Sequence, residues 1–209
     1  TELNKQWSEV ENTYTTVANG KTSLDAFVSG MDQALSTYSI TDTYKKNYET
    51  LKKDAEKKLD KVEDKVEGIT WYMPKNEPQY INERCYVTAY VGVKGDEVWM
   101  CNRFNYTGDN WVFYNKIILS ADGEKIEKDI GSFATTRNSG GDVGEYYDEP
   151  LKINGAMDLE EIQFMAKIAD AQDAIIRFKG NDYSYDYTVS STDKQMIRDA
   201  IELYRALLP

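Results

Sequence analysis

The residues of this chain that could do chemistry are carboxylates, tyrosines and two cysteines, because the sequence contains no histidine. Histidine is the commonest general base near neutral pH and a common ligand of zinc and iron. Without it, Ser/His/Asp and Cys/His nucleophile arrangements cannot form. Two cysteines are also too few for a four-cysteine metal site. We therefore expect no catalytic residue, no metal site and no cofactor. The lack of histidine and the small number of cysteines favour a protein that is not an enzyme.

Carboxylates are abundant, with 36 acidic residues against 25 basic ones. Asp142, Glu145, Asp148 and Glu149 follow closely on one another beside a glycine-rich stretch. Their spacing does not match the D-x-[DN]-x-[DN]-G pattern of a calcium loop, so we interpret them as solvated loop side chains. Two carboxylates at a suitable distance are nevertheless enough for glycoside hydrolysis. A carboxylate-dependent glycan hydrolase therefore stays an alternative.

The net charge of −11 limits the partners of the protein, because it repels phosphate backbones. We expect no nucleic acid partner. The stretch "NGKTS" at 19–23 resembles the end of a phosphate-binding loop, but Thr15 stands where that motif requires glycine. No apolar run approaches the roughly 18 residues of a membrane span, so no transmembrane segment is expected.

The two cysteines lie in two predicted strands that flank the turn Lys94-Gly95-Asp96. Folding at that turn places Cys85 opposite Asn105 or Tyr106, and Cys101 several residues further along the ladder. That offset exceeds the Cα separation of about 7 Å that a disulfide allows. The spacing therefore predicts two small buried thiols.

The first 68 residues are typical of helices. Two short runs end and restart around Asn19-Gly20, and a third places Tyr44, Tyr48, Leu51, Ala55, Leu59, Val62 and Val66 on one narrow stripe. The other faces of this third run are Lys, Asp and Glu, which suits a coiled-coil-like helix in a hairpin or bundle. Residues 1–68 are thus predicted to be a segment of three helices. Glu67-Gly68 is the predicted boundary.

Residues 69–209 are predicted to form an α+β domain. Stretches rich in β-branched and aromatic residues alternate with turn signals up to about residue 130, which is typical of an antiparallel meander. A helix capped by Asp158, a hairpin around Gly180-Asn181-Asp182 and a closing helix opened by Thr192 follow. We therefore expect an antiparallel sheet, made of the meander and a C-terminal hairpin, covered by two helices.

The stretch "NWVFYNKIIL" places Trp111 and Phe113 on one face of a predicted strand, and Val112 and Tyr114 on the other. Apolar residues on both faces indicate a central strand between two layers. We therefore predict that Trp111 and Phe113 belong to the core. The stretches "EYYD" and "YSYDY" are better surface candidates, because tyrosine offers an apolar body and a polar tip. The candidate ligand-binding residues are Tyr146, Tyr147, Asp148, Tyr183 and Tyr185.

From about Arg84 onward, the order of the pieces resembles a recurring domain of uncharacterised exported proteins and lipoproteins from Gram-positive and gut bacteria. The matching stretches are "GDNWVFYNKIILSADG", "GGDVGEYYDEPL" and "AIIRFKGNDYSYDYTVSSTDKQMIRDAIELYRAL", which lie within about 60% of the chain. The resemblance implies export and tethering through a lipid on an N-terminal cysteine that is lost here, which would account for Thr1. It implies no catalytic residues.

The leading expectation for function is a non-enzymatic binding or interaction module at the cell surface or secreted from the cell. Its partner would be a protein or a glycan, recognised by tyrosines with nearby carboxylates. Besides the hydrolase, a second alternative is a structural protein that associates with itself through its N-terminal helices, mainly residues 41–67. The expected location is extracellular, either membrane-anchored as a lipoprotein or secreted.

Overall fold

The computed structural model describes residues 42–139, 142–153 and 156–208. The chain divides into two compact units, Thr1–Leu51 and Lys52–Pro209. The helices predicted within residues 1–41 lie outside the described residues, so the N-terminal bundle stays a prediction. No helix of the described residues is long and apolar enough to cross a membrane.

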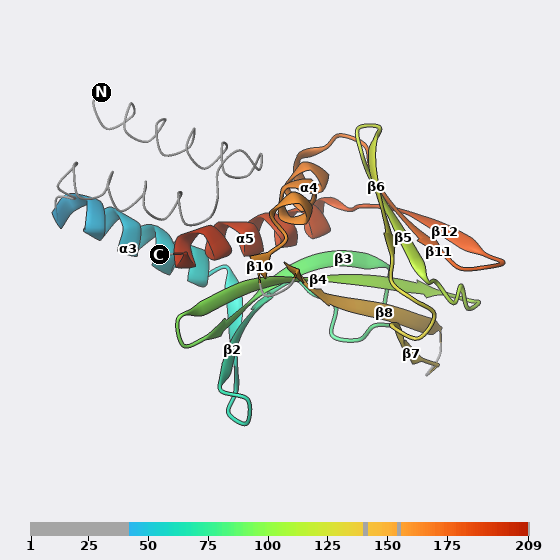
Figure 1. The fold of residues 1–209 in the computed structure, drawn as a ribbon, viewed down its shortest axis with the longest axis horizontal. Coiled ribbons are helices and arrows are strands. Elements are labelled where there is room, and N and C mark those ends of the chain that lie inside the picture. Colours follow the sequence, from blue (N-terminus) through green and yellow to red (C-terminus); the bar gives the residue numbers. More distant parts are fainter. Residues whose placement is uncertain (1–41, 140–141, 154–155, 209) are drawn as a thin grey trace. The chain divides into compact units, whose positions relative to one another are not determined.

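The larger sheet has six antiparallel strands in the order β1-β2-β3-β4-β8-β7 (Figure 1). Their bounds are β1 Leu59–Asp64, β2 Ile69–Pro74, β3 Tyr86–Lys94, β4 Glu97–Gly108, β7 Thr136–Asn138 and β8 Val143–Pro150. Strands β2, β3 and β4 are the first three strands of the meander predicted after Gly68, whereas β1 lies before Gly68 and the strand predicted next in the meander belongs to a second sheet. Tyr90 pairs with Cys101 and Tyr86 with Asn105, so the two cysteines are far apart along the ladder and both are free and buried, as expected.

The second sheet has four antiparallel strands in the order β12-β11-β5-β6. Its strands are β5 Lys116–Ala121, β6 Glu124–Asp129, β11 Ala174–Lys179 and β12 Ser184–Thr188, and a small pair is formed by β9 Lys152–Ile153 and β10 Ala156–Met157. The C-terminal hairpin thus joins β5, whose two apolar faces require cover on both sides. The class is α+β as predicted, but the strands form two main sheets instead of one.

Three helices belong to the described residues: α3 Asp42–Glu56, α4 Leu159–Asp170 and α5 Ser191–Leu207. Helices α4 and α5 pack on each other, and α5 lies along one face of the six-stranded sheet (Figure 1). The core lies between that face, the two helices and the four-stranded sheet. It contains fully buried residues from all of them, among them Val87, Met100, Phe104, Ile117, Ile176, Ile197 and Leu203. Burying each such side chain contributes about 1.5–3 kcal/mol.

The helix caps follow local sequence chemistry. The Asp158 carboxylate accepts a hydrogen bond from the backbone N–H of Glu161 at 3.0 Å, which confirms the predicted start of α4. Helix α5 begins earlier than predicted. Ser190, and not Thr192, is its N-cap, and the Ser190 hydroxyl accepts from the N–H of Asp193 at 3.1 Å.

Residues 59–64 form strand β1, although the sequence predicted that the third helix would continue to residue 66. Helix α3 ends at Glu56, Leu59 is buried opposite Pro74, and Val62 pairs with Trp71. Apolar residues spaced by three and four positions predicted a helix in this segment. Its backbone groups form hydrogen bonds with β2 instead, and this tertiary pairing outweighs the local helical pattern. The second half of the predicted association segment is therefore strand.

Residues 110–115 form a loop, although the sequence predicted a strand there. Val112 and Tyr114 are buried, Trp111 is partly buried against the core, and the Phe113 ring is 55% exposed. The placement of Phe113 in the core was therefore wrong. The cause is Glu145, whose Oε1 accepts hydrogen bonds from the N–H groups of Val112 and Phe113 at 2.7 and 2.8 Å. These bonds hold the backbone off the strand path and turn Phe113 outward.

The acidic stretch 142–149 also differs from the prediction. Only Asp142 is an exposed side chain, whereas Glu145, Asp148 and Glu149 lie on strand β8. Glu145 has no exposed surface and pairs with Arg137 at 3.3 Å. The glycines before this stretch suggested a solvated loop, but the chain enters a central strand at Val143, and its carboxylates find cationic or amide partners inside the fold.

Candidate functional site

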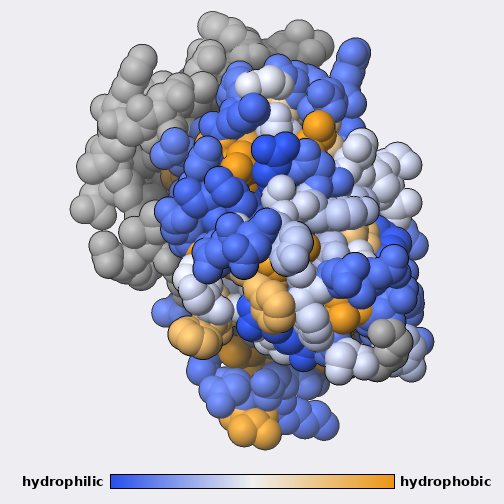
Figure 2. Space-filling model, turned by 90° about the vertical axis from the view of Figure 1, so that its right-hand side faces the viewer, coloured by the Kyte–Doolittle hydropathy of each residue, from blue (hydrophilic) through white to orange (hydrophobic). Residues whose placement is uncertain are grey.

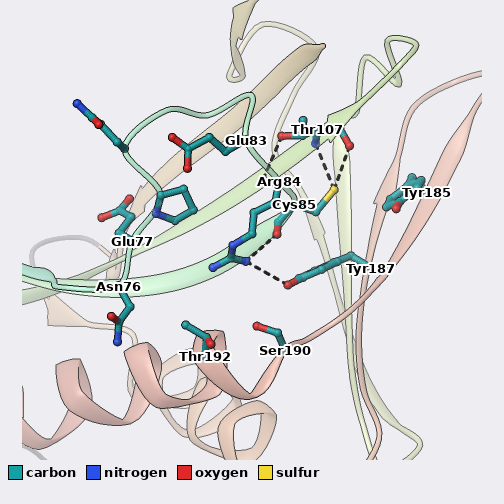
Figure 3. A pocket seen from close by; sticks show the side chains of 12 residues that line it. Asn76, Glu77, Glu83, Arg84, Cys85, Thr107, Tyr185, Tyr187, Ser190 and Thr192 are labelled. Carbon is teal, nitrogen blue, oxygen red and sulfur yellow. Dashed lines mark hydrogen bonds between the residues drawn. The ribbon is translucent and has the colours of Figure 1, made fainter. Parts of the chain in front are cut away.

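An open hollow of about 890 Å³ lies between the start of β3, the connection that precedes it, strand β12 and the first turn of α5 (Figure 3). Its volume is in the range of small-molecule sites. Ten of its twelve lining residues have polar or charged side chains, and five of these carry hydroxyls: Thr107, Tyr185, Tyr187, Ser190 and Thr192. Tyr185 and Tyr187 stand two residues apart on β12, so both rings point into the hollow (Figure 3).

The carboxylate of Asp193 lies behind one wall of the hollow and contacts two residues that line it, Arg84 and Tyr187. Asp193 is fully buried in the first turn of α5, where the helix dipole favours a negative charge. Tyr187 donates its hydroxyl proton to Oδ2 at 2.5 Å, and the N–H of Val87 donates to the same oxygen at 3.4 Å. Arg84 lies 2.9 Å from Oδ1 as an ion pair that lacks the geometry of a hydrogen bond.

These contacts fix the position and the protonation of the side chains that face the hollow. Burial, together with the hydrogen bond to the Asp193 carboxylate, raises the pKa of Tyr187 to about 12. The phenol therefore stays neutral at physiological pH. Arg84 also donates to the backbone carbonyl of Cys85 at 2.9 Å, which aims its guanidinium along the wall (Figure 3).

The thiol of Cys85 lines the hollow but is built as a structural group. It donates to the carbonyl of Thr107 at 3.2 Å and accepts from the N–H of the same residue at 3.2 Å. Burial raises its pKa, so the thiolate is scarce at neutral pH. This thiol is therefore poorly suited to act as a nucleophile.

Glu77 joins the hollow to a charged cluster on the outer face of the six-stranded sheet. Its carboxylate accepts from Arg103 Nη1 at 2.5 Å and from the Tyr86 hydroxyl at 3.3 Å. Burial raises the pKa of Glu77, and the charge of Arg103 opposes that rise. Arg103 also forms a bidentate salt bridge with Asp148, in which Nε donates to Oδ1 at 2.7 Å and Nη2 donates to Oδ2 at 2.9 Å.

The structure separates the five tyrosine and aspartate residues predicted to bind a ligand. Tyr146 and Asp148 belong to the Arg103 cluster, with the Tyr146 ring 5.3 Å from the guanidinium carbon. Tyr147 points to the opposite face of β8, where burial beside Glu149 raises its pKa to about 12. Tyr185 lines the hollow, and Tyr183 is 68% exposed in the turn before β12.

Sequence reasoning missed Arg84, Tyr187 and Asp193. The pattern that could have found them is Ser190-x-x-Asp193, a serine followed three residues later by an acid at the start of an apolar run. That pattern places a carboxylate in the first turn of a helix. The burial of Asp193 beside Arg84 depends on contacts between residues that are far apart in the sequence. Val87 and Asp193, for example, are separated by 106 positions, and no local pattern shows such a contact.

A second acidic cluster ties both sheets to α4. Lys128 on β6 makes short contacts with Glu149 on β8 and Glu161 on α4, and Asn102 on β4 donates to Glu161 at 3.0 Å. Burial, reinforced by the charge of Glu161, raises the pKa of Glu149 to about 7. One ammonium thus serves both carboxylates.

Among the residues that the structure describes, no group of three or more acids or cysteines is arranged to hold a metal ion. Comparison with known proteins adds no identity: the chain matches no family model, and no curated protein or solved structure is significantly similar to it. The hollow and its chemistry are therefore the basis for a functional assignment.

Proposed function

We propose that the protein is a non-enzymatic binding module and that its hollow takes a hydroxyl-rich ligand, with glycans the class that fits best. The observation that carries this proposal is the lining of the hollow, where two tyrosine rings stand beside Arg84, carboxylates and hydroxyls. Pyranose rings offer C–H faces that pack on aromatic rings, and their hydroxyls pair with charged and hydroxyl side chains.

The state of the polar groups around the hollow supports binding over catalysis. The Cys85 thiol and the Tyr187 phenol are held protonated, and the Asp193 and Glu77 carboxylates are each occupied by an arginine. Groups fixed by partners of this kind are pre-organised donors and acceptors. They cost little to order when a ligand binds.

A binding screen tests the proposal in two stages. The full chain is applied to an array of neutral and acidic oligosaccharides, and the best oligosaccharide is then titrated by calorimetry. Tyr185→Ala and Thr192→Ala should each weaken binding by about tenfold, because both residues line the hollow.

Neighbouring residues provide the matched controls. Tyr183→Ala removes an exposed tyrosine from the same hairpin, and Ser191→Ala removes an exposed hydroxyl from the same helix turn, but neither lines the hollow. Both variants should bind like the parent. Equal losses in the control and lining variants, or no oligosaccharide bound above background, would refute the assignment.

The glycan hydrolase remains a second candidate, because Glu77 and Glu83 both line the hollow and the pKa of Glu77 is raised by burial. A general acid has this property. Incubation with the oligosaccharide that binds best separates the two functions. Binding alone leaves the sugar intact, whereas hydrolysis that is lost in Glu77→Gln or Glu83→Gln would replace the binding proposal.

We also propose that the module acts outside the cell, anchored or secreted. The support is the resemblance of residues from Arg84 onward to exported domains, and a glycan ligand suits that location. Fractionation of the native cells with an antibody to this chain tests the location. Finding the protein in the cytoplasmic fraction alone would overturn it.

The self-association alternative has less support, since β1 replaces the second half of residues 41–67. Sedimentation at several protein concentrations tests it: a mass independent of concentration is expected, and a concentration-dependent mass lost on deleting residues 1–51 would favour association.

A further inference from the structure

Three loops meet at one end of the four-stranded sheet. They are residues 109–115 between β4 and β5, residues 130–135 between β6 and β7, and residues 180–183 between β11 and β12. The turn of the β11–β12 hairpin and the loop after β4 lie on the same side of the Lys52–Pro209 unit (Figure 1). We call these three segments the aromatic loop end.

Asn115 holds the three loops together. Its N–H donates to the carbonyl of Lys179 at 3.0 Å, and its own carbonyl accepts from the N–H of Ile130 at 2.9 Å. Its side-chain amide donates to Asn181 at 2.9 Å. A Cβ added to Gly180 would lie 2.1 Å from the carbonyl oxygen of Val112, so the first and third loops are also in backbone contact. The loops are therefore fixed relative to one another.

Each loop exposes one large aromatic side chain. The exposed fractions are 55% for Phe113, 96% for Phe133 and 68% for Tyr183. Figure 2 faces this end and shows apolar side chains distributed among hydrophilic ones. Trp111 adds a fourth ring, stacked on Phe113 with 5.7 Å between centroids, and the Arg137 guanidinium lies 5.2 Å from the Phe113 centroid.

Folding stability does not account for the position of Phe113. Its φ of +50° is in the left-handed region, which costs a residue with a side chain about 1–2 kcal/mol. Glycine would avoid that cost, and an exposed phenylalanine recovers little of it through burial. Strain of this kind collects at binding surfaces, where the structure around it holds the residue in place. Here the buried Glu145 does so by accepting hydrogen bonds from the N–H groups of Val112 and Phe113.

The charge at this end is mainly negative, although the exposed Lys179 directly precedes the third loop and Lys116, which follows the first loop, pairs with Glu127 and Asp129. The only charged residues in the three loops are Asp109 and Asp182, and both are exposed. The nearby Arg137 is paired with the fully buried Glu145, so it adds no free positive charge. An aromatic centre with an acidic rim complements a cationic surface, and the net charge of −11 favours the same partner at long range.

We propose that the aromatic loop end is a docking surface for a protein partner that presents lysines and arginines around an apolar cleft. Tryptophan, tyrosine and arginine are the residues that dominate protein interfaces, and loops fixed on a rigid sheet present them with little entropy cost. The acidic rim disfavours an anionic membrane. This site is separate from the hollow, so the inference holds whatever ligand the hollow takes.

Selection from a displayed library of random 12-residue peptides tests the surface on the full chain. The selected peptides should be enriched in Lys or Arg together with apolar residues. Their binding to a triple variant, Phe113→Gly with Phe133→Ala and Tyr183→Ala, should fall at least about tenfold. Asp109→Asn with Asp182→Asn should weaken binding less, and mainly in the presence of little salt.

Two control variants keep the test specific. Val66→Ala removes an apolar side chain that is 92% exposed in the turn after β1, and Tyr185→Ala changes the hollow. Both should bind the selected peptides within about twofold of the parent, and circular dichroism should show that all variants are folded. Peptides without basic residues, peptides insensitive to the triple variant, or triple-variant-sensitive flotation with zwitterionic or anionic vesicles would each overturn the proposal.

Discussion

The hollow and the aromatic loop end are both built around one fully buried carboxylate, but the two acids do opposite things to the surface above them. Asp193 accepts mainly from side chains, and draws Tyr187 and Arg84 back into a recess. Glu145 accepts from two consecutive backbone amides, and so forces an aromatic ring outward. In this protein, the buried acid with mainly side-chain partners lies behind a recess, and the buried acid with backbone N–H partners lies beneath an exposed ring.

The two acids also differ in what compensates their burial. Asp193 lies in the first turn of α5, where the helix dipole adds to the charge of Arg84. Glu145 lies on strand β8, so it depends on Arg137 and on the two amides alone. Removal of Glu145 should be the more damaging change, because it leaves Arg137 and two backbone N–H groups without their acceptor.

The largest effect is expected for Glu145→Ala, which should lower the free energy of unfolding by about 3–5 kcal/mol in urea denaturation. The variant leaves Arg137 and the amides of Val112 and Phe113 without their acceptor. Asp193→Ala is the matched change at the hollow and should cost about 1 kcal/mol less, because Arg84 is more exposed than Arg137 and regains water more easily. A cost below about 1 kcal/mol for Glu145→Ala would remove the basis of the comparison.

The third buried acidic site, where two acids share Lys128, should show a pH dependence near neutrality. Burial raises the pKa of Glu149 from 4.5 to about 7, so the folded state binds this proton more tightly than the unfolded state does. The stability that follows is fully present below pH 4.5 and is lost as the pH rises through about 7, by up to about 3 kcal/mol. Denaturation midpoints measured between pH 4.5 and 8 should show this decline, and Glu149→Gln should flatten it. An equal decline in the variant would assign it to other groups.

Two substitutions at Phe113 separate backbone strain from the contacts of the ring. Phe113→Gly and Phe113→Ala both remove the ring, but only glycine adopts a φ of +50° without a steric cost. The glycine variant should be more stable than the alanine variant by about 1 kcal/mol, whereas both should lose peptide binding equally. An alanine variant as stable as the glycine variant would show that Phe113 is not strained.

The smallest effect is expected for Arg177→Ala, which removes an ion pair with Asp186 on the outer face of the hairpin. Both side chains are about half exposed, so the pair contributes about 0–1 kcal/mol. Neither glycan binding at the hollow nor peptide binding at the loops should change. A loss of either would mean that the hairpin as a whole, and not the named side chains, determines binding.

Sequence periodicity predicted what depends on local contacts. The β2–β3–β4 part of the meander, the Asp158 cap, the β11–β12 turn and the lack of a disulfide between Cys85 and Cys101 all follow from alternation, cap residues and turn residues. It missed what depends on partners distant in the chain. Leu59 belongs to a strand because β2 pairs with it, and Phe113 is exposed because its N–H donates a hydrogen bond to Glu145, 32 residues away.

The candidate site was predictable only in its chemistry. Tyrosines with neighbouring carboxylates were the expected recognition groups, and Tyr185 does line the hollow. Tyr146 and Tyr147 are consecutive on β8, so their side chains point to opposite faces of the sheet and cannot share one site. Arg84 and Asp193 meet only because α5 packs on β3, and local sequence patterns do not predict such tertiary packing.

The most direct test of the binding assignment is a titration of the ¹⁵N-labelled chain, followed by NMR, with the oligosaccharide selected on the array. We expect amide shifts concentrated at Cys85, Thr107, Tyr185 and Thr192, with the amides of Val112 and Phe113 unchanged. Shifts concentrated at the aromatic loop end, or spread evenly over both sheets, would contradict the account.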